Sequence, residues 1–247
     1  MRFEVDIVFA GFPGRLTNGV LGWGSVALVR GEGQIMLIDA GGPVIRNKFQ
    51  ELLAKRGLSF QDIDIVTLSH LHFDHAYNID LFSKALFVLS KQEWDYANNI
   101  SKNKRDIFIE EKAIPLLRVF KTALIEKDNE EIIPGITAIL TPGHTPGCMS
   151  VICEQEHDQK WLFAGDAIKN RGEILRQDFG LTLNLEQSIN SLAKIKKVAT
   201  RILPGHDGWI TVDGDKIVAE GGNDFTIVFE QGLTVNGGLK EITIHLD

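Results

Sequence analysis

The chain has 247 residues, of which 44% are hydrophobic and 24% are charged, so it can bury a core and is not expected to be disordered. Its 26 Lys and Arg residues against 33 Asp and Glu residues leave a formal charge of −7. This balance argues against nucleic-acid backbone binding as the main task. The two cysteines, Cys148 and Cys153, would lie about 16 Å apart along one strand, which excludes a disulfide between them.

Targeting and domain signals are sparse. No apolar run approaches the roughly 20 residues that a membrane-spanning helix needs. Glu4 and Asp6 interrupt the stretch where a signal peptide would be apolar, so we expect a soluble, cytoplasmic protein. The chain has no short internal repeat and no linker rich in Pro, Gly or Ser, which favours a single domain over residues 1–247.

Hydrophobic periodicity predicts strands and helices that alternate through the middle of the chain, with strands at both ends. In chain order we expect strands at 3–9, 25–30 and 34–39, a helix at 43–56, strands at 63–68 and 85–89, and helices at 91–98 and 106–120. Strands at 136–140, 148–153 and 160–164, a helix at 184–198 and a strand at 200–203 follow. We expect the second of the middle helices to be kinked at Pro115, the helix at 184–198 to open with a capping box, and the tail at about 210–247 to be rich in strands.

Three of the seven histidines fall within six residues, in His70-Leu-His72-Phe-Asp74-His75, directly after the predicted strand at 63–68. His70 and His72 point the same way in an extended chain, so they can meet at one point. Asp74 and His75 follow a bend and can reach a second point beside it. The plainer interpretations are turn histidines bonded to the backbone and, for Asp74, a helix N-cap.

Three more predicted strands each end at a glycine that is followed by one metal-competent side chain. These ends are Pro-Gly-His144, Gly-Asp166 and Pro-Gly-His206. Glycine allows close backbone approach and unusual torsions. Side chains delivered from four separate strands would meet at one sheet edge, with the preorganisation that a catalytic metal needs.

The residue types point to two cations rather than one. Imidazole and carboxylate suit zinc, with iron or manganese as alternatives. Five histidines and two aspartates are too many for one tetrahedral ion, but they suit two ions about 3.5–4 Å apart that share a carboxylate. Water held by such ions is deprotonated near neutral pH, so the pattern favours a dinuclear metal-dependent hydrolase.

These motifs resemble those of the metallo-β-lactamase superfamily, in the same order and over residues 25–207, with Leu-Ile-Asp39-Ala-Gly-Gly upstream. The resemblance implies an α/β fold, a four-layer αββα sandwich with the metals in a groove at the sheet edge. It also implies the ligand sets: His70, His72 and His144 for one ion, Asp74, His75 and His206 for the other, and Asp166 as the bridge. Asp39 would steady the histidine loop from behind, and Asp74 would orient the bridging hydroxide as the catalytic residue.

Within that superfamily, the segments 69–76 and 141–147 are most similar to acyl-homoserine-lactone lactonases. Those enzymes commonly carry a tyrosine just after the bridging aspartate, whereas the stretch from Asp166 to Arg171 has none. We therefore expect a hydrolase that attacks the carbonyl of an ester, lactone, thioester or amide.

Four side chains are candidates for substrate contact. Lys169 and Arg171 follow the bridging aspartate and could hold an anionic group. Trp23 and Trp209 could wall the pocket. Solvated loop charges and core packing are the plainer interpretations of the same residues.

Three other functions stay open on sequence grounds. A phosphodiesterase or ribonuclease would use the same two ions, and a mononuclear iron dioxygenase acting on a persulfide would use only the region of His70, His72 and Asp166. A metal-binding interaction module is disfavoured because structural zinc sites are closed and rich in sulfur. We expect a small-molecule substrate and no membrane partner. Nucleic acid is disfavoured but stays open with the ribonuclease alternative, and a homodimer stays open as well.

Overall fold

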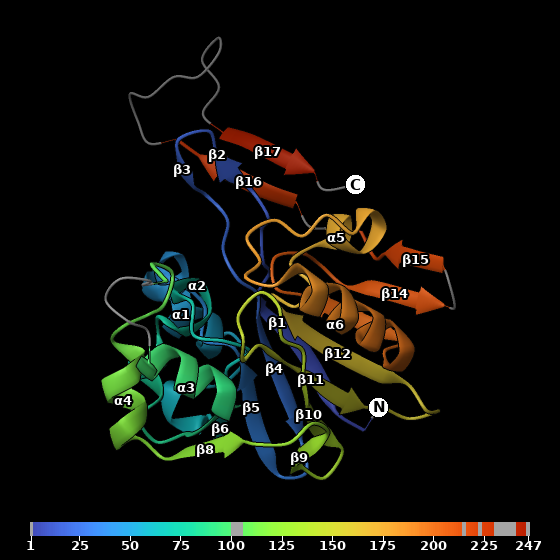
Figure 1. Ribbon diagram of the computed structural model, residues 1–247. Helices are drawn as coiled ribbons and strands as arrows, with labels where there is room; N and C mark the ends of the chain where they lie inside the picture. Colours follow the sequence, from blue (N-terminus) through green and yellow to red (C-terminus); the bar gives the residue numbers. More distant parts are fainter. Residues whose placement is uncertain (1, 100–105, 214–215, 222–223, 230–240, 246–247) are drawn as a thin grey trace.

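The computed structural model describes residues 2–99, 106–213, 216–221, 224–229 and 241–245. Two mixed β-sheets pack face to face, and helices cover their outer faces (Figure 1). The predicted four-layer αββα sandwich is confirmed. Among the described residues, no helix is both long enough and apolar enough to cross a membrane.

The first sheet combines antiparallel pairing at one edge with parallel pairing in its centre. Its strands lie in the order β1, β4, β5, β6, β7 and β8. Their bounds are Glu4–Phe9, Val26–Gly31, Gln34–Ile38, Ile65–Thr67, Leu86–Ser90 and Thr122–Ile125. Helices α1 (Arg46–Ala54), α2 (Phe73–Ala76), α3 (Lys91–Asn99) and α4 (Ala113–Val119) lie on its outer side, with short 3-10 turns at Pro43–Ile45, Phe60–Asp62 and Ile79–Phe82.

The second sheet is antiparallel except for one parallel pair, β12 with β13. Its strands lie in the order β15, β14, β13, β12, β11, β10 and β9. Their bounds are Lys216–Ala219, Ile210–Asp213, Arg201–Pro204, Lys160–Gly165, Met149–Glu154, Ile136–Leu140 and Glu130–Ile133. Helices α5 (Arg171–Arg176) and α6 (Leu185–Val198) belong to its outer side (Figure 1).

Alternation along the strands produces three apolar layers, because successive side chains point to opposite faces of a sheet. In β4, Leu28 packs toward the helices on the outside, whereas Ala27 and Val29 pack between the sheets. In β12, Phe163 faces the inter-sheet core and Leu162 faces the layer beneath α6. Burial on both faces explains why these strands are nearly continuous apolar runs.

Most element expectations are confirmed within a residue or two, but the helix expected over 106–120 is wrong in its first half. Residues 106–112 are irregular, and Ile109 instead forms a β-bridge with His72. Helix α4 begins only at Ala113, so Pro115 lies in its first turn, where amides have no intrahelical acceptor and proline is tolerated. Pairing with the distant histidine segment therefore overrides the local helical pattern.

The capping box expected at α6 is half formed. The Asn184 side chain accepts a hydrogen bond from the amide of Gln187 at 3.0 Å, so the N-cap is present. The amide of Asn184, which a capping box would satisfy locally, donates instead to the carbonyl of Gly143 at 2.9 Å. That bond ties the start of α6 to the loop that carries His144.

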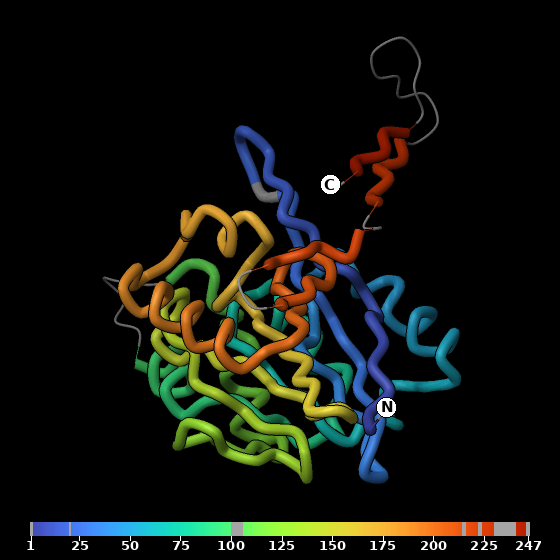
Figure 2. The backbone as a smooth tube through the Cα atoms, turned by 90° about the vertical axis from the view of Figure 1, so that its right-hand side faces the viewer, coloured from blue at the N-terminus to red at the C-terminus, as the bar shows by residue number. Residues whose placement is uncertain are grey.

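Two small hairpins project beyond the sandwich, as the tube in Figure 2 shows. One is β2 (Arg15–Leu16) with β3 (Gly19–Val20), and the other is β16 (Asp224–Val228) with β17 (Glu241–His245). Phe225 of β16 contacts the rings of Phe12 and Trp23, with centroids 4.6 and 5.6 Å away. The second hairpin is thus seated on the base of the first.

Candidate metal centre

The predicted ligands follow strands whose ends meet at one edge of the two sheets. β5 and β6 run parallel, as do β12 and β13, so the ends of each pair emerge side by side. The histidine segment follows β6, and His72 is the extended residue that precedes the short helix α2. Asp74 lies inside that helix and therefore does not act as its N-cap. The structure brings together His70, His72, Asp74, His75, His144, Asp166 and His206.

Two glycines permit this convergence. A Cβ on Gly205 would lie 2.1 Å from Oδ1 of Asp166. A Cβ on Gly165 would lie 2.4 Å from the Cβ of Ser69. Gly165 also has φ of +51°, a conformation that favours glycine. Because Gly165 lacks a side chain, the loop carrying Asp166 can approach the histidine segment. Because Gly205 lacks one, the loop carrying His206 can approach Asp166.

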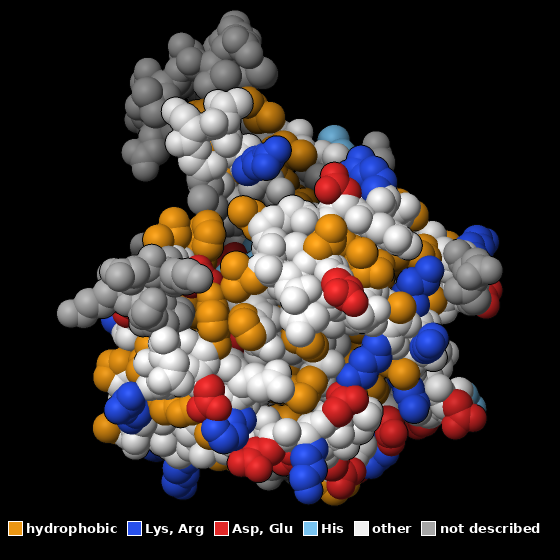
Figure 3. Space-filling view, in the orientation of Figure 1, with side chains coloured by type: hydrophobic (Ala, Val, Ile, Leu, Met, Phe, Trp, Pro, Cys, Tyr) orange, Lys and Arg blue, Asp and Glu red, His pale blue; other side chains and the backbone are white. Residues whose placement is uncertain are grey.

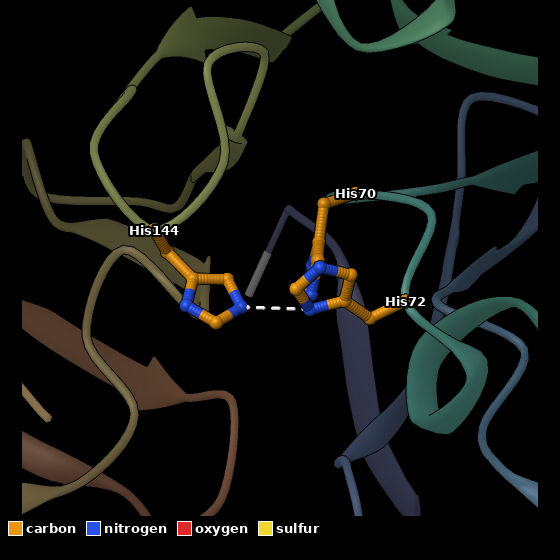
Figure 4. Close-up of side chains that lie close together, drawn as sticks. All are labelled: His70, His72 and His144. Atoms are coloured by element: carbon orange, nitrogen blue, oxygen red, sulfur yellow. Dashed lines mark hydrogen bonds between the residues drawn. The ribbon is translucent and has the colours of Figure 1, made fainter. Parts of the chain in front are cut away.

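The first ligand group consists of His70, His72 and His144, whose nearest ring nitrogens all lie within 4.8 Å of one another. Nε2 of His144 is 2.9 Å from Nδ1 of His72, and Figure 4 shows these two rings pointing toward each other beside His70. Nε2 of His70 is buried and has no hydrogen-bond partner among the described residues. Three imidazole nitrogens facing one point fit a single cation.

The second ligand group consists of Asp74, His75 and His206, again within 4.8 Å. Asp166 lies between the two groups. Its Oδ1 is 3.2 Å from Nε2 of His75 and 3.2 Å from Nε2 of His206, and its Oδ2 is 3.3 Å from Nε2 of His144. Oδ1 and Nε2 of His75 are also buried without a hydrogen-bond partner in the described chain. Because buried polar atoms without partners cost free energy unless something binds them, this set of ligand atoms fits two cations that share Asp166.

Outer contacts determine which nitrogen each histidine presents inward. Nδ1 of His206 bonds the carbonyl of Trp23 at 2.8 Å, and Nδ1 of His144 bonds the carbonyl of Leu181 at 2.7 Å. Such contacts fix the tautomer and leave the opposite nitrogen as a lone pair for a cation. The remaining outer partners are Ser69 for His70, Asp106 for His72 and Asp39 for His75.

Asp39 lies where the resemblance placed it, behind the histidine segment. Its carboxylate accepts hydrogen bonds from the amide and hydroxyl of Ser69, at 2.7 and 2.8 Å. Oδ2 also lies 2.7 Å from Nδ1 of His75. Asp39 is buried and holds φ of +59°, which is uncommon for a residue other than glycine. One carboxylate thus ties the start of the segment to its end.

The electrostatics differ between the two ligand groups: burial lowers the pKa of His70 and His144, whereas at His75 and His206 the carboxylate of Asp166 outweighs burial and the pKa is raised. Burial, with help from neighbouring histidines, holds the pKa of His70 well below its usual range, and burial lowers the pKa of His144 to about 3. Burial opposes ionisation of Asp166, but His206 and His75 outweigh it and hold its pKa well below the ordinary value. At neutral pH His70 and His144 are therefore neutral imidazoles and the bridging Asp166 is a carboxylate.

A cleft of about 970 Å³ opens over the centre and is lined by His72, Asp74, His144, Asp166 and His206 at its base. Of the four candidate substrate contacts, Lys169 lines this cleft. The structure places the other three side chains elsewhere. Arg171 pairs with Asp207 at 2.7 Å, Trp23 donates through Nε1 to the carbonyl of Ala10, and Trp209 packs on Trp161 and Phe163.

Several supporting residues had no sequence signal. Asp106 lies 3.0 Å from Nε2 of His72, and Tyr96 donates to the same carboxylate at 3.1 Å. Glu93, fully buried in α3, accepts from the amide of Leu71 at 3.0 Å and from the hydroxyl of Thr145 at 2.6 Å. Each of these acids stands alone in sequence, and only the folded chain shows that it contacts a ligand loop.

The sequence model of the metallo-beta-lactamase superfamily matches residues 21–206, which is most of the chain and spans the site from Asp39 to His206. The chain belongs to the metallo-β-lactamase superfamily. The resemblance expected from the motifs is thereby confirmed, and the four-layer sandwich is the metallo-β-lactamase fold. The chain is a metal-dependent hydrolase of this superfamily, and its clusters of histidine and aspartate fit a dinuclear centre.

Two relatives are similar in sequence to this superfamily member. It is 29% identical over 175 residues to a probable metallo-hydrolase of Methanocaldococcus jannaschii, covering 70% of this chain and 71% of that protein. It is 28% identical over 160 residues to an N-acyl homoserine lactonase of Bacillus cereus, covering 63% and 60%. The match thus spans less than two thirds of the lactonase.

Solved structures agree on the fold. A probable metal-dependent hydrolase from Staphylococcus aureus superposes with a TM-score of 0.74 at 19% identity, covering 88% of this chain and 96% of that one. An N-acyl homoserine lactone hydrolase with N-hexanoyl-L-homoserine at its metal centre superposes with a TM-score of 0.66 at 20% identity, covering 83% and 92%.

Proposed function

We propose that the protein is a dinuclear zinc hydrolase in which water attacks the carbonyl carbon of an ester, lactone, thioester or amide and the bond from that carbon to oxygen, sulfur or nitrogen is broken. The observation that carries the proposal is the pair of three-residue ligand groups joined by Asp166. His70, His72 and His144 would hold one ion, and Asp74, His75 and His206 the other. When bound, the two ions supply Lewis acidity and a water that deprotonates near neutral pH. Nitrogen and oxygen donors without sulfur suit zinc at such an open site.

The chain's own residues would position the reaction. Asp74 is part of the cleft lining, and its Oδ2 lies 3.4 Å from Nε2 of His206 and 3.8 Å from Nε2 of His75. A carboxylate at this place can accept a hydrogen bond from the attacking water and aim its lone pair at the carbonyl carbon. As the bond to the leaving oxygen, sulfur or nitrogen breaks, the proton taken from water passes to the leaving group.

The similarity to N-acyl homoserine lactonases supports lactones as the first carbonyl class to test. Aryl phosphodiesters belong in the same panel because two cations also suit phosphoryl transfer. Hydrolysis of lactones, esters, thioesters or amides, together with two zinc ions per chain by elemental analysis, would support the proposal. Cleavage of the phosphodiesters alone, or a single iron per chain with oxygen uptake, would overturn it.

A matched pair of variants tests the ligand groups directly. His72→Asn removes a donor from the first group, whereas His157→Asn changes an exposed histidine in a turn where φ is +57°, a conformation that Asn tolerates. We expect His72→Asn to lose at least one bound ion and most activity, with His157→Asn unchanged. Removing the ions with a chelator should lower the melting temperature, because ions bound only to the folded state stabilise it. Equal metal content in both variants would contradict the assignment.

A further inference from the structure

Lys169 occupies a fixed place on the cleft wall beside the ligand groups. It follows Asp166 by three residues, and its main chain is hydrogen-bonded to His206 and to Glu173. Its carbonyl accepts from the amide of His206 at 2.7 Å, and its amide donates to Oε2 of Glu173 at 2.7 Å. The backbone of Lys169 is therefore fixed by hydrogen bonds to the proposed ligand His206 and to Glu173.

The ammonium of Lys169 is buried and only partly satisfied. Nζ lies 2.7 Å from Oε1 of Glu173, and the two side chains are 14% and 4% exposed. This ion pair can occupy one of the three N–H donors, and no other described residue accepts a hydrogen bond from the ammonium. An ammonium has three donors and no acceptor. Burying it with its donors unfilled is costly unless a ligand completes them.

The rest of the cleft suggests what that ligand looks like. Arg176, also on the lining, has its guanidinium over Gly172, where a Cβ would meet Nη2 at 2.8 Å. A third cation, Arg15, lines the cleft from the β2–β3 hairpin. Of the five acids on the described lining, three contact site histidines and Glu173 pairs with Lys169. The fifth is Asp178. Lys169, Arg176 and Arg15 are thus the three Lys and Arg side chains of the described lining, and most of its acids already have partners.

Apolar side chains line much of the remaining cleft. They are Phe12, Pro13, Phe73, Ile107, Phe108, Leu181 and Leu183. Ile107 and Leu181 are 79% and 74% exposed, although both are large hydrophobic residues. Figure 3 shows apolar side chains gathered on this face below the β2–β3 hairpin. Such a surface matches a ligand with an apolar body.

We propose that the substrate carries a carboxylate or phosphate group besides the carbonyl that is attacked, and that Lys169 binds this anion. The inference rests on the proposed hydrolase function and narrows its substrate class to anionic acyl compounds. Glu173 positions the ammonium, Arg176 and Arg15 on the lining favour a substrate of the same negative charge, and the apolar lining receives the body of the substrate. Arg171 takes no part, because its guanidinium is held by Asp207.

The test uses substrate pairs that differ only in charge. One pair is the γ-lactone 5-oxotetrahydrofuran-2-carboxylate and its primary amide, and the other is the glutaryl and glutaramoyl thioesters of N-acetylcysteamine. We expect the intact, metal-loaded enzyme to prefer the carboxylate member in kcat/KM. Lys169→Met should lower kcat/KM for the carboxylate member about tenfold to a hundredfold, mainly through KM, since a charge-assisted hydrogen bond contributes on that scale. The amide member should change by less than about threefold.

Three further variants keep the test sharp. Lys169→Arg should restore part of the preference, and Lys197→Met, which removes an exposed charge at the end of α6, should keep all of it. Lys169→Met leaves Glu173 unpaired, so the double variant with Glu173→Gln tests the same loss without a buried lone charge. A wild-type enzyme that treats both members alike, or a Lys169→Met variant that slows both equally through kcat, would overturn the inference.

A binding measurement separates this inference from the hydrolase proposal. Calorimetric titration of the metal-loaded protein with glutarate and with its neutral diamide, glutaramide, needs no turnover. Tighter binding of glutarate that Lys169→Met abolishes supports the anion site even if neither substrate pair is cleaved. Equal affinity for the two compounds overturns it even if both pairs are cleaved.

Discussion

Asp39 and His75 are joined by a 2.7 Å contact between Oδ2 and Nδ1, although 36 residues separate them in sequence. The same oxygen accepts from the hydroxyl of Ser69. Burial alone would lower the pKa of His75, but the carboxylates of Asp166 and Asp39 raise it well above its usual range. This contact orients the imidazole so that Nε2 faces Asp166.

Asp39→Asn should weaken binding of the ion held by His75. An amide in place of the carboxylate presents a donor toward Nδ1 or loses the bond, so the tautomer is no longer fixed. Losses of about tenfold to a hundredfold in metal affinity are typical for such outer partners. Competition with a coloured chelator would measure the change, with Asp213→Asn on the exposed end of β14 as control. Unchanged affinity for both ions would contradict the role.

Glu93→Ala should destabilise the protein strongly. Glu93 is the buried acid that accepts from Leu71 on one ligand loop and from Thr145 on the other, and burial raises its pKa. Truncation leaves two buried donors without acceptors, at a cost of about 1–3 kcal/mol each. Urea unfolding of the metal-free protein should therefore show a loss of about 2–5 kcal/mol, and Glu93→Gln, which keeps the shape and one acceptor, should lose less. Equal stability of the two variants would argue against this role.

The pair of Arg46 and Asp80 should contribute stability that acid removes. Arg46 donates to both carboxylate oxygens, at 2.8 and 2.7 Å, and this bonding holds the pKa of Asp80 below its ordinary 3.8. A lowered folded-state pKa means that the contribution is complete above about pH 5 and is lost as the pH falls through 3.8 toward the folded value. Asp80→Asn should cost about 0.2–1 kcal/mol at pH 7, as for a surface pair.

The gap between wild type and Asp80→Asn should close toward pH 3. Urea unfolding of the metal-free protein at the two pH values would measure it, and Asp213→Asn should show no comparable gap. A difference that widens on acidification would have the wrong sign for this pair.

Both cysteines should be inert in the folded protein. Cys148 and Cys153 are buried, and burial raises the pKa of the Cys153 thiol to about 12 and that of Cys148 well above its usual range. The thiolate is the reactive form, so iodoacetamide at pH 8 should modify neither thiol in the native chain and both in urea. Mass spectrometry counts the adducts. Modification of the native protein with loss of activity would show that a thiol is accessible.

The sequence by itself determined the seven metal-competent side chains and most strands and helices in the middle of the chain, but not β8, β9 and α5. Those signals are local: apolar periodicity identifies a strand, and a glycine with a histidine or aspartate at its end identifies a ligand position. Because such strand ends meet at one sheet edge, the sequence alone predicted that His70, His144, Asp166 and His206 would converge.

The tertiary structure alone decided how each ligand is held and which charges face the cleft. The carbonyl that fixes His206 belongs to Trp23, 183 residues away, and no sequence pattern encodes that contact. Lys169 and Arg171 look equivalent in sequence. In the structure Arg171 forms an ion pair with Asp207, whereas Lys169 lines the cleft beside the metal centre. Periodicity reports only what a residue shares with its near neighbours along the chain. The direction of a side chain in a loop depends on partners that arrive from elsewhere in the fold.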